Sequence, residues 1–352
     1  MNRHLISSEA SLLDALRKLN ELSGSTMTLF AVDSSGRVYG TVTDGDIRRA
    51  LLAGARPEGP VAAAANRNFS YVRGERPDVA CLRELRLKGI RLVPRLDDEG
   101  CLAGIIDLNA TPSMLPLRAL LMAGGKGERL RPLTLTTPKP LLEIDGKAII
   151  DYNVEALAAV GVADITVSTA YMADAIDAHF AAPVAGVQVR TVRESQPLGT
   201  IGAASLLDWP DDGGDALVMN SDLLTTISFE EMYLHHKAQD ADITIAAIPY
   251  AVSVPYAILT TDGARVTGIE EKPSYSHYAN AGIYMMRPGV LRSVPPGERT
   301  DATDLIERVI ASGGRVAYYV IRGTWIDVGS PTDFRQASEL MRHHKNLLEI
   351  KK

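Results

Sequence analysis

The chain has 352 residues, of which 46% are hydrophobic and 23% are charged, and its formal net charge is −6. This length exceeds what one hydrophobic core usually holds, so we expect two domains that are folded throughout. The negative net charge gives no electrostatic reason to expect nucleic acid or an anionic membrane surface as a partner. The sequence has neither a membrane-spanning apolar run nor the apolar core of a signal peptide, so we expect a cytoplasmic protein.

Only two cysteines, Cys81 and Cys101, are present. They are too few for a disulfide scaffold, and they lack the spacing of a zinc site. We expect both to be small buried hydrophobic residues with no chemistry of their own.

Two segments in the first third of the chain are similar, LFAVDSSGRVYGTVTDGDI (29–47) and VPRLDDEGCLAGIIDLNA (93–110). In each, an apolar run, a polar turn with glycine and a second apolar run predict a β-hairpin. A helical stretch precedes each hairpin, and a second helix is expected at Asp46–Ala53. The sequence therefore predicts an internal duplication with the order helix, hairpin, helix in both copies.

The first copy contains a Thr43–x–x–Asp46 motif, in which a hydroxyl and a helix-starting carboxylate can meet phosphate and ribose. With this motif, residues 1–112 resemble a tandem pair of CBS domains, which commonly bind adenine nucleotides in the cleft between the repeats. The matching positions in the second copy are Asp107 and Ala110, so the resemblance implies at most one competent site. Alternatively, Asp46 only caps a helix and the module serves oligomerisation. Because CBS pairs often meet face to face, we expect a homo-oligomer.

The segment NATPSMLP (109–116) contains two prolines and no apolar periodicity, so we interpret 113–117 as a linker and 118–352 as the second domain. This domain opens with LRALLMAGGKGERLRPLT (117–134), an apolar strand that runs into a glycine-rich turn. The glycines expose backbone amides and the basic side chains add positive charge, which suits a polyphosphate. The spacing matches neither Gly-x-Gly-x-x-Gly nor a P-loop.

The turn is followed by TPKPLLEIDGK, which places Lys139 between two prolines. The combination of GG-x-G-x-R-L with PKPLL resembles the sugar-1-phosphate nucleotidyltransferases. The resemblance implies an α/β fold, with a Rossmann-like mixed-sheet (GT-A-like) domain following the tandem CBS (Bateman) module. It implies that Arg129 and Lys139 neutralise the charge of an NTP. It further implies that the triphosphate is cradled by Ala123, Gly124, Gly125, Lys126 and Gly127.

Apolar runs alternate with helical stretches after this loop, which indicates a layered α/β sheet with ligands at the carboxyl ends of its strands. Asp222 directly follows one such run, and Asp327 lies in GTWIDVGS. The resemblance implies that these two carboxylates hold Mg²⁺, which prefers oxygen ligands and keeps several waters. The expected strands are Ile165–Ser168, Val187–Val192, Ala216–Met219 and Ile243–Ile248. The expected helices are Asp151–Val160, Ala173–Phe180 and Phe229–Gln239.

The segment ESQPLGTIGA contains Glu194 and Gly199, which the resemblance places at the nucleotide base. A carboxylate can accept hydrogen bonds from both N1–H and the exocyclic amine of guanine, whereas uracil or thymine would offer one donor and a repelling carbonyl. The sequence therefore favours GTP, and UTP, dTTP and CTP are the alternatives.

The segment GIEEKPSYSHYANAGIYMM contains a Glu-Lys-Pro motif and an Asn-x-Gly turn. The resemblance implies that Lys272 holds the incoming phosphate and that Glu271 accepts sugar hydroxyls. Just upstream, Ala257 stands where relatives usually have a glycine close to the sugar ring. The implied sugar-phosphate site consists of Tyr256, Glu271, Lys272, Asn280 and Gly282.

His235 and His236 are neighbours in a helical run and point to different faces, so we expect two solvated histidines and no metal site.

Together these features predict transfer of a nucleotidyl group from an NTP, with GTP favoured, to a sugar 1-phosphate. The layout resembles guanylyltransferases that act on mannose-like or hexosamine 1-phosphates, including the glucosamine-1-phosphate enzyme of legionaminic acid assembly. The alternative from another class is a regulatory nucleotide-binding protein with an inactive transferase fold. A decayed site should lose clustered charges that cost stability, yet the chain retains Arg129, Lys139, Asp222, Lys272 and Asp327.

Overall fold

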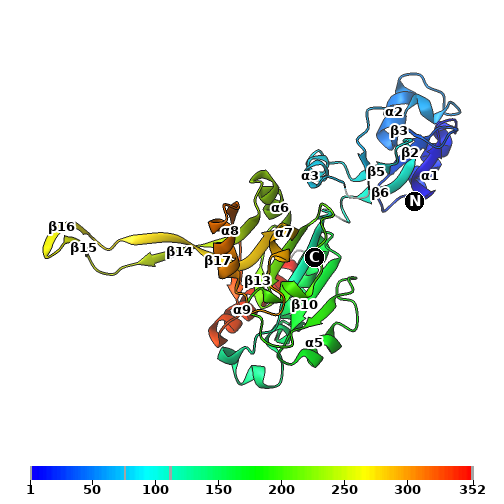
Figure 1. The fold of residues 1–352 in the computed structure, drawn as a ribbon. Coiled ribbons are helices and arrows are strands. Elements are labelled where there is room, and N and C mark those ends of the chain that lie inside the picture. Colours follow the sequence, from blue (N-terminus) through cyan, green and yellow to red (C-terminus); the bar gives the residue numbers. More distant parts are fainter. Residues whose placement is uncertain (1, 75–76, 111–112, 350–352) are drawn as a thin grey trace. The chain divides into compact units, whose positions relative to one another are not determined.

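The computed structural model of the protein describes residues 2–74, 77–110 and 113–349. The chain forms two compact units, Met1–Met114 and Leu115–Lys352, which we call unit 1 and unit 2 (Figure 1). From the sequence, we expect the first domain to end at residue 112, whereas unit 1 ends at Met114. Residues 111–112 lie outside the described part of the chain. The Leu115 amide donates to the Val160 carbonyl oxygen, so the expected linker is anchored on unit 2. Within the described ranges, no helix combines the length and apolarity needed to span a membrane.

Unit 1 contains two three-stranded sheets with the same topology. The first sheet consists of β1 (Leu5–Ser7), β2 (Thr28–Val32) and β3 (Val38–Thr43), and the second of β4 (Val72–Arg73), β5 (Leu92–Leu96) and β6 (Leu102–Asp107). In each, the first two strands are parallel and the last two are antiparallel. Both antiparallel pairs have a bulge at the corresponding place, between Ala31 and Val32 and between Arg95 and Leu96. The duplication is therefore visible in the fold.

The helices of the two copies differ. α1 (Leu12–Glu21) and α3 (Val79–Leu87) precede the two hairpins, and α2 (Asp44–Leu52) follows only the first. α2 begins with a capping box in which the Thr43 hydroxyl accepts from the Asp46 amide and the Asp46 carboxylate accepts from the Thr43 amide. The second copy has no helix in residues 108–110 or 113–116. The expectation of a closing helix is wrong for this copy, which lacks the capping residues that start one.

The two cysteines are free, but both are half-buried and not buried as expected. Cys101 directly precedes β6, and an isolated bridge pairs it with Arg37 of the first copy. This position explains its exposure.

Unit 2 is built around a seven-stranded mixed sheet. In the order in which they pair, its strands are β11 (Arg190–Arg193), β10 (Asp164–Thr169), β7 (Leu117–Met122), β12 (Asp215–Asn220), β17 (Ser274–Met286), β14 (Ile243–Ser253) and β18 (Val316–Val320). The first four are parallel to one another, and β17 is antiparallel to both of its neighbours. The Rossmann-like mixed sheet predicted from the sequence is confirmed.

Helices and two small sheets surround this central sheet. The core cluster packs strand residues such as Leu120 and Val218 against Leu291 of α7 and Leu305 of α8. The helices of unit 2 are α4 (Ile149–Ala159), α5 (Ala173–His179), α6 (Phe229–Ala238), α7 (Pro288–Arg292), α8 (Ala302–Ala311) and α9 (Pro331–Glu349). The small sheets are β8 (Glu143–Ile144) with β9 (Lys147–Ala148), and β13 (Leu223–Thr225) with β19 (Trp325–Asp327). The 3-10 helices are η1 (Asn2–His4) and η2 (Val61–Ala63) in unit 1 and, in unit 2, η3 (Glu128–Leu130), η4 (Leu133–Leu135), η5 (Lys139–Leu141) and η6 (Gly202–Leu206).

A long hairpin projects from unit 2, visible as the yellow ribbon in Figure 1. β14 and β17 continue as a two-stranded ribbon beyond Ala247, where the pairing of β14 with β18 ends. The ribbon is extended by β15 (Ile258–Asp262) and β16 (Arg265–Glu270), which pair with each other. At its root, the ring of Tyr278 lies 4.8 Å from that of Tyr318 on β18. We call residues 249–278 the arm.

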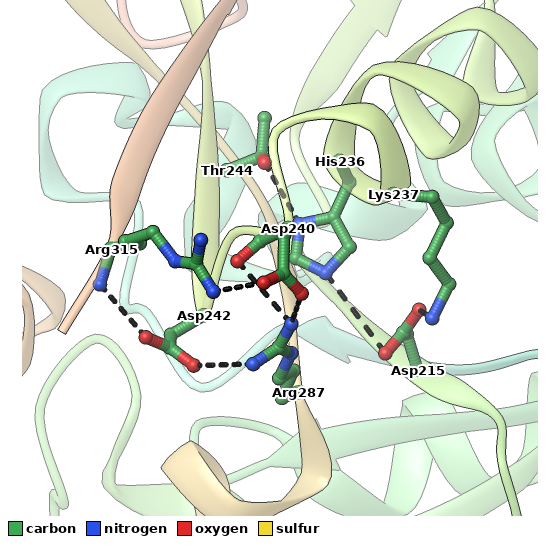
Figure 2. Close-up of polar contacts among 8 residues, drawn as sticks. All are labelled: Asp215, His236, Lys237, Asp240, Asp242, Thr244, Arg287 and Arg315. Carbon is green, nitrogen blue, oxygen red and sulfur yellow. Dashed lines mark hydrogen bonds and ion pairs between the residues drawn. The ribbon is translucent and has the colours of Figure 1, made fainter.

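A cluster of charged residues lies at the end of the sheet where β12 begins (Figure 2). Asp215 is 4% exposed, and the Lys237 ammonium lies 2.5 Å from its carboxylate. His236 is 1% exposed and its Nδ1 lies 2.8 Å from the Thr244 hydroxyl. Burial lowers the pKa of His236 to about 4, against the opposing charge of Asp215. The expectation of two solvated histidines is therefore wrong for His236, because α6 turns this side chain towards the sheet.

Candidate active site

Two aspartates from distant parts of the chain meet at the carboxyl end of β12. Asp222 precedes β13, and Asp327 is the last residue of β19. The two strands pair with Leu223 opposite Asp327. Leu224 and Ile326, the next residues inward, are buried in one hydrophobic cluster. Strand pairing and core packing therefore hold the two carboxylates side by side, and their role as metal ligands stays a prediction.

Lys139 lies between these carboxylates. Its ammonium group donates to Asp222 Oδ2 and, at 3.4 Å, to Asp327 Oδ1. Lys139 is 9% exposed and belongs to η5, whose preceding residue, Pro138, is in an extended conformation. A buried cation with two carboxylate partners is fixed in place before any ligand arrives.

The carboxylates have the chemistry of a divalent-cation site. Burial and then the neighbouring charge of Asp222 raise the pKa of Asp327. Asp222 Oδ1 is buried and has no hydrogen-bond partner among the described residues. Among the described residues, no group of three or more His, Cys, Asp or Glu side chains is arranged to hold a metal. A cation at this position would therefore have two carboxylates as its protein ligands. Mg²⁺ is typically bound in this way, with waters and substrate phosphates as its other ligands.

The glycine-rich loop between β7 and η3 packs directly on Lys139. Gly127 has a φ of +60°, and a Cβ there would lie 3.0 Å from Lys139 Cβ and 2.9 Å from Thr134 Cγ2. The Thr134 hydroxyl donates to the Gly127 carbonyl oxygen at 2.8 Å. Gly125 has open space where its side chain would be. The loop is thus tight on its protein side and open on its other side, as an anion-binding loop requires.

Glu194 follows β11 and lies over the same loop. A Cβ on Gly124 would lie 2.9 Å from Glu194 Oε1. Its other oxygen, Oε2, accepts from the Leu198 amide at 3.0 Å. One edge of the carboxylate is therefore fixed by the backbone, and the other faces the loop.

Gly199 joins the segment after Glu194 to the loop before α8. Its φ is +84°, and a Cβ there would lie 2.6 Å from the Thr300 carbonyl oxygen. Asp301 accepts from the Thr200 amide at 3.0 Å and from Arg299 at 3.2 Å. Sequence analysis missed Arg299 and Asp301, which lie in a polar loop that carries no motif. Only the folded contacts between the two loops bring them to the site.

These elements enclose a cleft of about 470 Å³. Arg129 lies near Asp327 outside the lining of this cleft, since a Cβ on Gly329 would be 2.9 Å from the Arg129 guanidinium and 3.4 Å from Asp327 Oδ1. Lys126 is exposed on the loop. The residues that line the cleft are Met122, Ala123, Gly124, Gly125, Lys139, Pro140, Glu194, Pro197, Gly199, Thr200, Asn220, Ser221, Asp222, Arg299 and Asp301.

Comparison with known sequences decides the family. The nucleotidyl transferase family model matches residues 118–344. The chain belongs to the nucleotidyl transferase family. The CBS domain model matches residues 1–53, which contain the first copy of the duplication.

Several curated relatives of this nucleotidyl transferase are named for guanylyl transfer. They include the mannose-1-phosphate guanylyltransferase catalytic subunit beta of Danio rerio, 32% identical over 226 residues, and the mannose-1-phosphate guanyltransferase of Neurospora crassa, 32% identical over 227 residues. Each match covers 62% of this chain, and the chain spans 62% of the length of each relative. A solved Bacillus anthracis structure, of a protein assigned as a glucose-1-phosphate thymidylyltransferase in complex with sucrose, has a TM-score of 0.50 and 22% identity. It covers 64% of this chain and 95% of its own, and it shows the fold alone.

The predicted sugar-phosphate residues of this nucleotidyl transferase fall into two groups. Asn280 and Gly282 lie beside the cleft without lining it, because a Cβ on Gly282 would be 2.5 Å from the side chain of Asn220, which does line it. Asn280 Oδ1 accepts from the Gly282 amide at 2.9 Å, which shapes the turn. The other three lie on the arm, do not line the cleft and are exposed: Tyr256, Glu271 and Lys272.

A second cleft, of about 300 Å³, lies in unit 1. Thr43 lines it together with Thr41, Asn66 and Arg91, so that both copies contribute. The Asp46 carboxylate is held by the Thr43 amide and hydroxyl, and it does not line this cleft. The capping role considered from the sequence is therefore present in the structure.

Proposed function

We propose that the protein transfers a nucleotidyl group from an NTP, with GTP favoured, to a sugar 1-phosphate and releases pyrophosphate. The observation that carries this proposal is the meeting of Lys139 with Asp222 and Asp327 beside the glycine-rich loop, at a cleft that Lys139 and Asp222 line. These groups supply backbone amides, positive charge and a place for a divalent cation. Membership of the nucleotidyl transferase family supports the same reaction.

In this reaction an oxygen of the sugar 1-phosphate attacks the α-phosphorus of the NTP. The bond from the α-phosphorus to the oxygen that bridges to the β-phosphate breaks, and pyrophosphate leaves with that oxygen. The attacking oxygen is already anionic, so no general base is needed. Arg129 and Lys139 would offset charge on the triphosphate. Mg²⁺, held by Asp222 and Asp327, would supply further positive charge at the phosphates.

Glu194 supports GTP as the nucleotide. Its position over the loop leaves Oε1 free of backbone bonds while Leu198 orients the carboxylate. Each carboxylate oxygen can accept two hydrogen bonds, so the pair can receive N1–H and the exocyclic amine of guanine. The curated relatives named as guanylyltransferases favour the same choice. UTP, dTTP and CTP remain the alternatives.

The test is a pyrophosphate-release assay of the full chain with Mg²⁺, each of GTP, UTP, dTTP and CTP, and mannose, glucose and glucosamine 1-phosphates. We expect release only when both substrates are present, fastest with GTP. A higher kcat/KM with another nucleotide would reject the assignment of Glu194. Tight nucleotide binding with no release for any pair would instead favour the inactive regulator.

We also propose that the unit 1 cleft binds an adenine nucleotide. Arg91 in the cleft wall provides a guanidinium for phosphate, whereas the Thr43 hydroxyl already donates to Asp46. Calorimetry with AMP and ATP should show binding that Arg91→Ala weakens at least about tenfold, a loss typical of one charged hydrogen bond. Asp78→Ala is the control, because Asp78 caps α3 and does not line the cleft. Unchanged binding in Arg91→Ala would remove this proposal.

A further inference from the structure

The arm exposes apolar side chains on its inner part and on its outer part. In an antiparallel ribbon, residues directly opposite each other point to the same side. On the inner part, Val252 is opposite Tyr275 and Tyr250 lies on the same side. On the outer part, Leu259 is opposite Ile269. The opposite side pairs Ser253 with Ser274, but it also exposes Tyr278 and Ile258. Leu259 and Ile269 define the apolar face of the outer part.

Nothing in the described part of unit 2 covers this face. Leu259 is 53% exposed and Ile269 is 70% exposed. Beyond Ala247 the arm has two strands and no third. A two-stranded ribbon is marginally stable in water by itself, and exposed apolar residues gathered on such a ribbon mark an interaction surface. The arm is therefore built to lie against another protein surface.

The arm also carries groups that the cleft lacks. Lys272 and Glu271 lie where both strands are interrupted, opposite Val254, whose amide donates to the Pro273 carbonyl oxygen at 2.9 Å. Lys272 precedes Asn280 beside the cleft by eight positions. At the rise of an extended strand, these positions are separated by roughly 25 Å. Without a large bend, the arm cannot bring Lys272 to the cleft of its own chain.

We propose that two copies of the chain exchange arms, so that each arm lies across the other copy and brings Lys272 and Glu271 to its cleft. This inference rests on the proposed function, which needs a cation for the sugar phosphate and acceptors for its hydroxyls. The arm leaves the sheet beside the cleft, where Gly282 packs on Asn220. A two-fold axis between the two copies would let each arm reach the other copy, and such an exchange closes after two copies.

A second copy is the occupant that the chemistry favours. The cleft has an NTP-sized volume, a metal position and, beside it, the Asn280–Gly282 turn, and the arm has the remaining ammonium and carboxylate groups. An unrelated partner would cover the apolar face but leave each cleft without these groups. Exchange satisfies both needs with one contact.

The test is complementation between two full-length variants, Lys272→Ala and Asp222→Asn, co-expressed with different tags. Each variant alone should retain less than about one hundredth of wild-type turnover. Random pairing makes half of the dimers mixed, and each mixed dimer has one intact site, so about a quarter of wild-type activity should return. No recovery in purified mixed dimers, or full wild-type activity as a monomer, would overturn the proposal.

A second measurement does not depend on turnover. Backbone hydrogen exchange at 258–270 should be at least about tenfold slower in the wild type than in the Leu259→Asp/Ile269→Asp variant, because an ordered interface protects amides. Thr260→Asp, on the opposite face of the same strand, is the matched control and should keep the protection. Equal exchange in all three proteins would overturn arm exchange. If the wild type releases no pyrophosphate with any substrate pair, the proposed function fails, and this exchange measurement alone judges the arm.

Discussion

The cleft and the arm carry motif residues of similar chemical kind in opposite physical states. In the cleft, Lys139 is buried and bonded to two carboxylates. On the arm, Lys272 is exposed on a two-stranded ribbon. The cleft is therefore organised before substrate binds, whereas the arm groups become organised only when a second surface meets them. The difference indicates that the cleft residues depend on the fold alone, whereas the arm residues depend on association with a second surface.

The first prediction concerns the removal of Lys139, the buried cation of the cleft. Lys139→Ala leaves the Asp222 and Asp327 carboxylates facing each other and takes positive charge from the proposed triphosphate position. We expect kcat/KM for pyrophosphate release to fall by about 10²–10³, the range for loss of one preorganised electrostatic group. Lys147→Ala is the control, because it removes a half-exposed ion pair with Glu155. Turnover within twofold of wild type in Lys139→Ala would contradict the role of this lysine.

A second prediction contrasts His236, which is buried in unit 2, with His277, which is exposed on the arm. The unfolded state protonates His236 near pH 6.5 and the folded state only near pH 4, so the unfolded state binds more protons between these values. Stability should therefore fall as the pH falls from 6.5 to 4, by about 3 kcal/mol.

Denaturant unfolding as a function of pH measures this effect. His236→Gln should lose most of the pH dependence in that window, and His277→Gln, on the arm, should keep it. If the free energy of unfolding has the same pH dependence in wild type and His236→Gln, the burial of neutral His236 does not cause that dependence.

A third, smaller effect concerns the joint between the two cleft loops. Gly199→Ala combines a positive φ with a close approach to the Thr300 carbonyl oxygen. We expect a loss of about 1–3 kcal/mol in the free energy of unfolding and a raised KM for the nucleotide. Gly186→Ala has a similar positive φ with nothing near its Cβ, so it isolates the contact. If Gly199→Ala and Gly186→Ala destabilise the protein equally and neither changes the KM for the nucleotide, Gly199 has no role in the site.

The smallest expected effect is that of Arg299, which lines the cleft but remains exposed. Its ion pair with Asp301 is on the surface, so its charge is screened. Arg299→Ala should raise the KM for the nucleotide by about threefold at low salt, equivalent to an exposed charge interaction of under 1 kcal/mol. The difference from wild type should shrink at high salt. An effect as large as that of Lys139→Ala would show that the cleft closes around Arg299.

The sequence predicted those parts of the molecule in which local pattern and final contacts agree. Apolar runs at Ala216–Met219 and Ile243–Ile248 became β12 and β14, and Asp222 follows β12 as expected. Gly127 could be recognised as a loop residue because its conformation excludes most side chains. Asp222 and Asp327 could be paired because each lies in a recognisable family segment.

The remaining parts depend on tertiary contacts that no local pattern encodes. His236 and His235 are equivalent in sequence, and only the packing of α6 decides which one is buried. Arg299 reaches the cleft through contacts between two loops without a motif. The sequence of the arm is typical of ordinary β-strands. The alternation of apolar and polar residues predicts strands, but it does not tell whether a third strand or another chain covers them. The roles of Tyr256, Glu271 and Lys272 stay predictions for the same reason.

The most direct test of the central claim follows labelled phosphate through one reaction. Purified full-length protein is incubated with a sugar 1-phosphate, Mg²⁺ and GTP labelled at either the α- or the γ-phosphate. Nucleotidyl transfer predicts that the α-label appears in a sugar nucleotide and the γ-label in pyrophosphate, and that Asp222→Asn abolishes both. An α-label that stays in GTP, or a γ-label released as inorganic phosphate with no sugar nucleotide formed, would contradict the account.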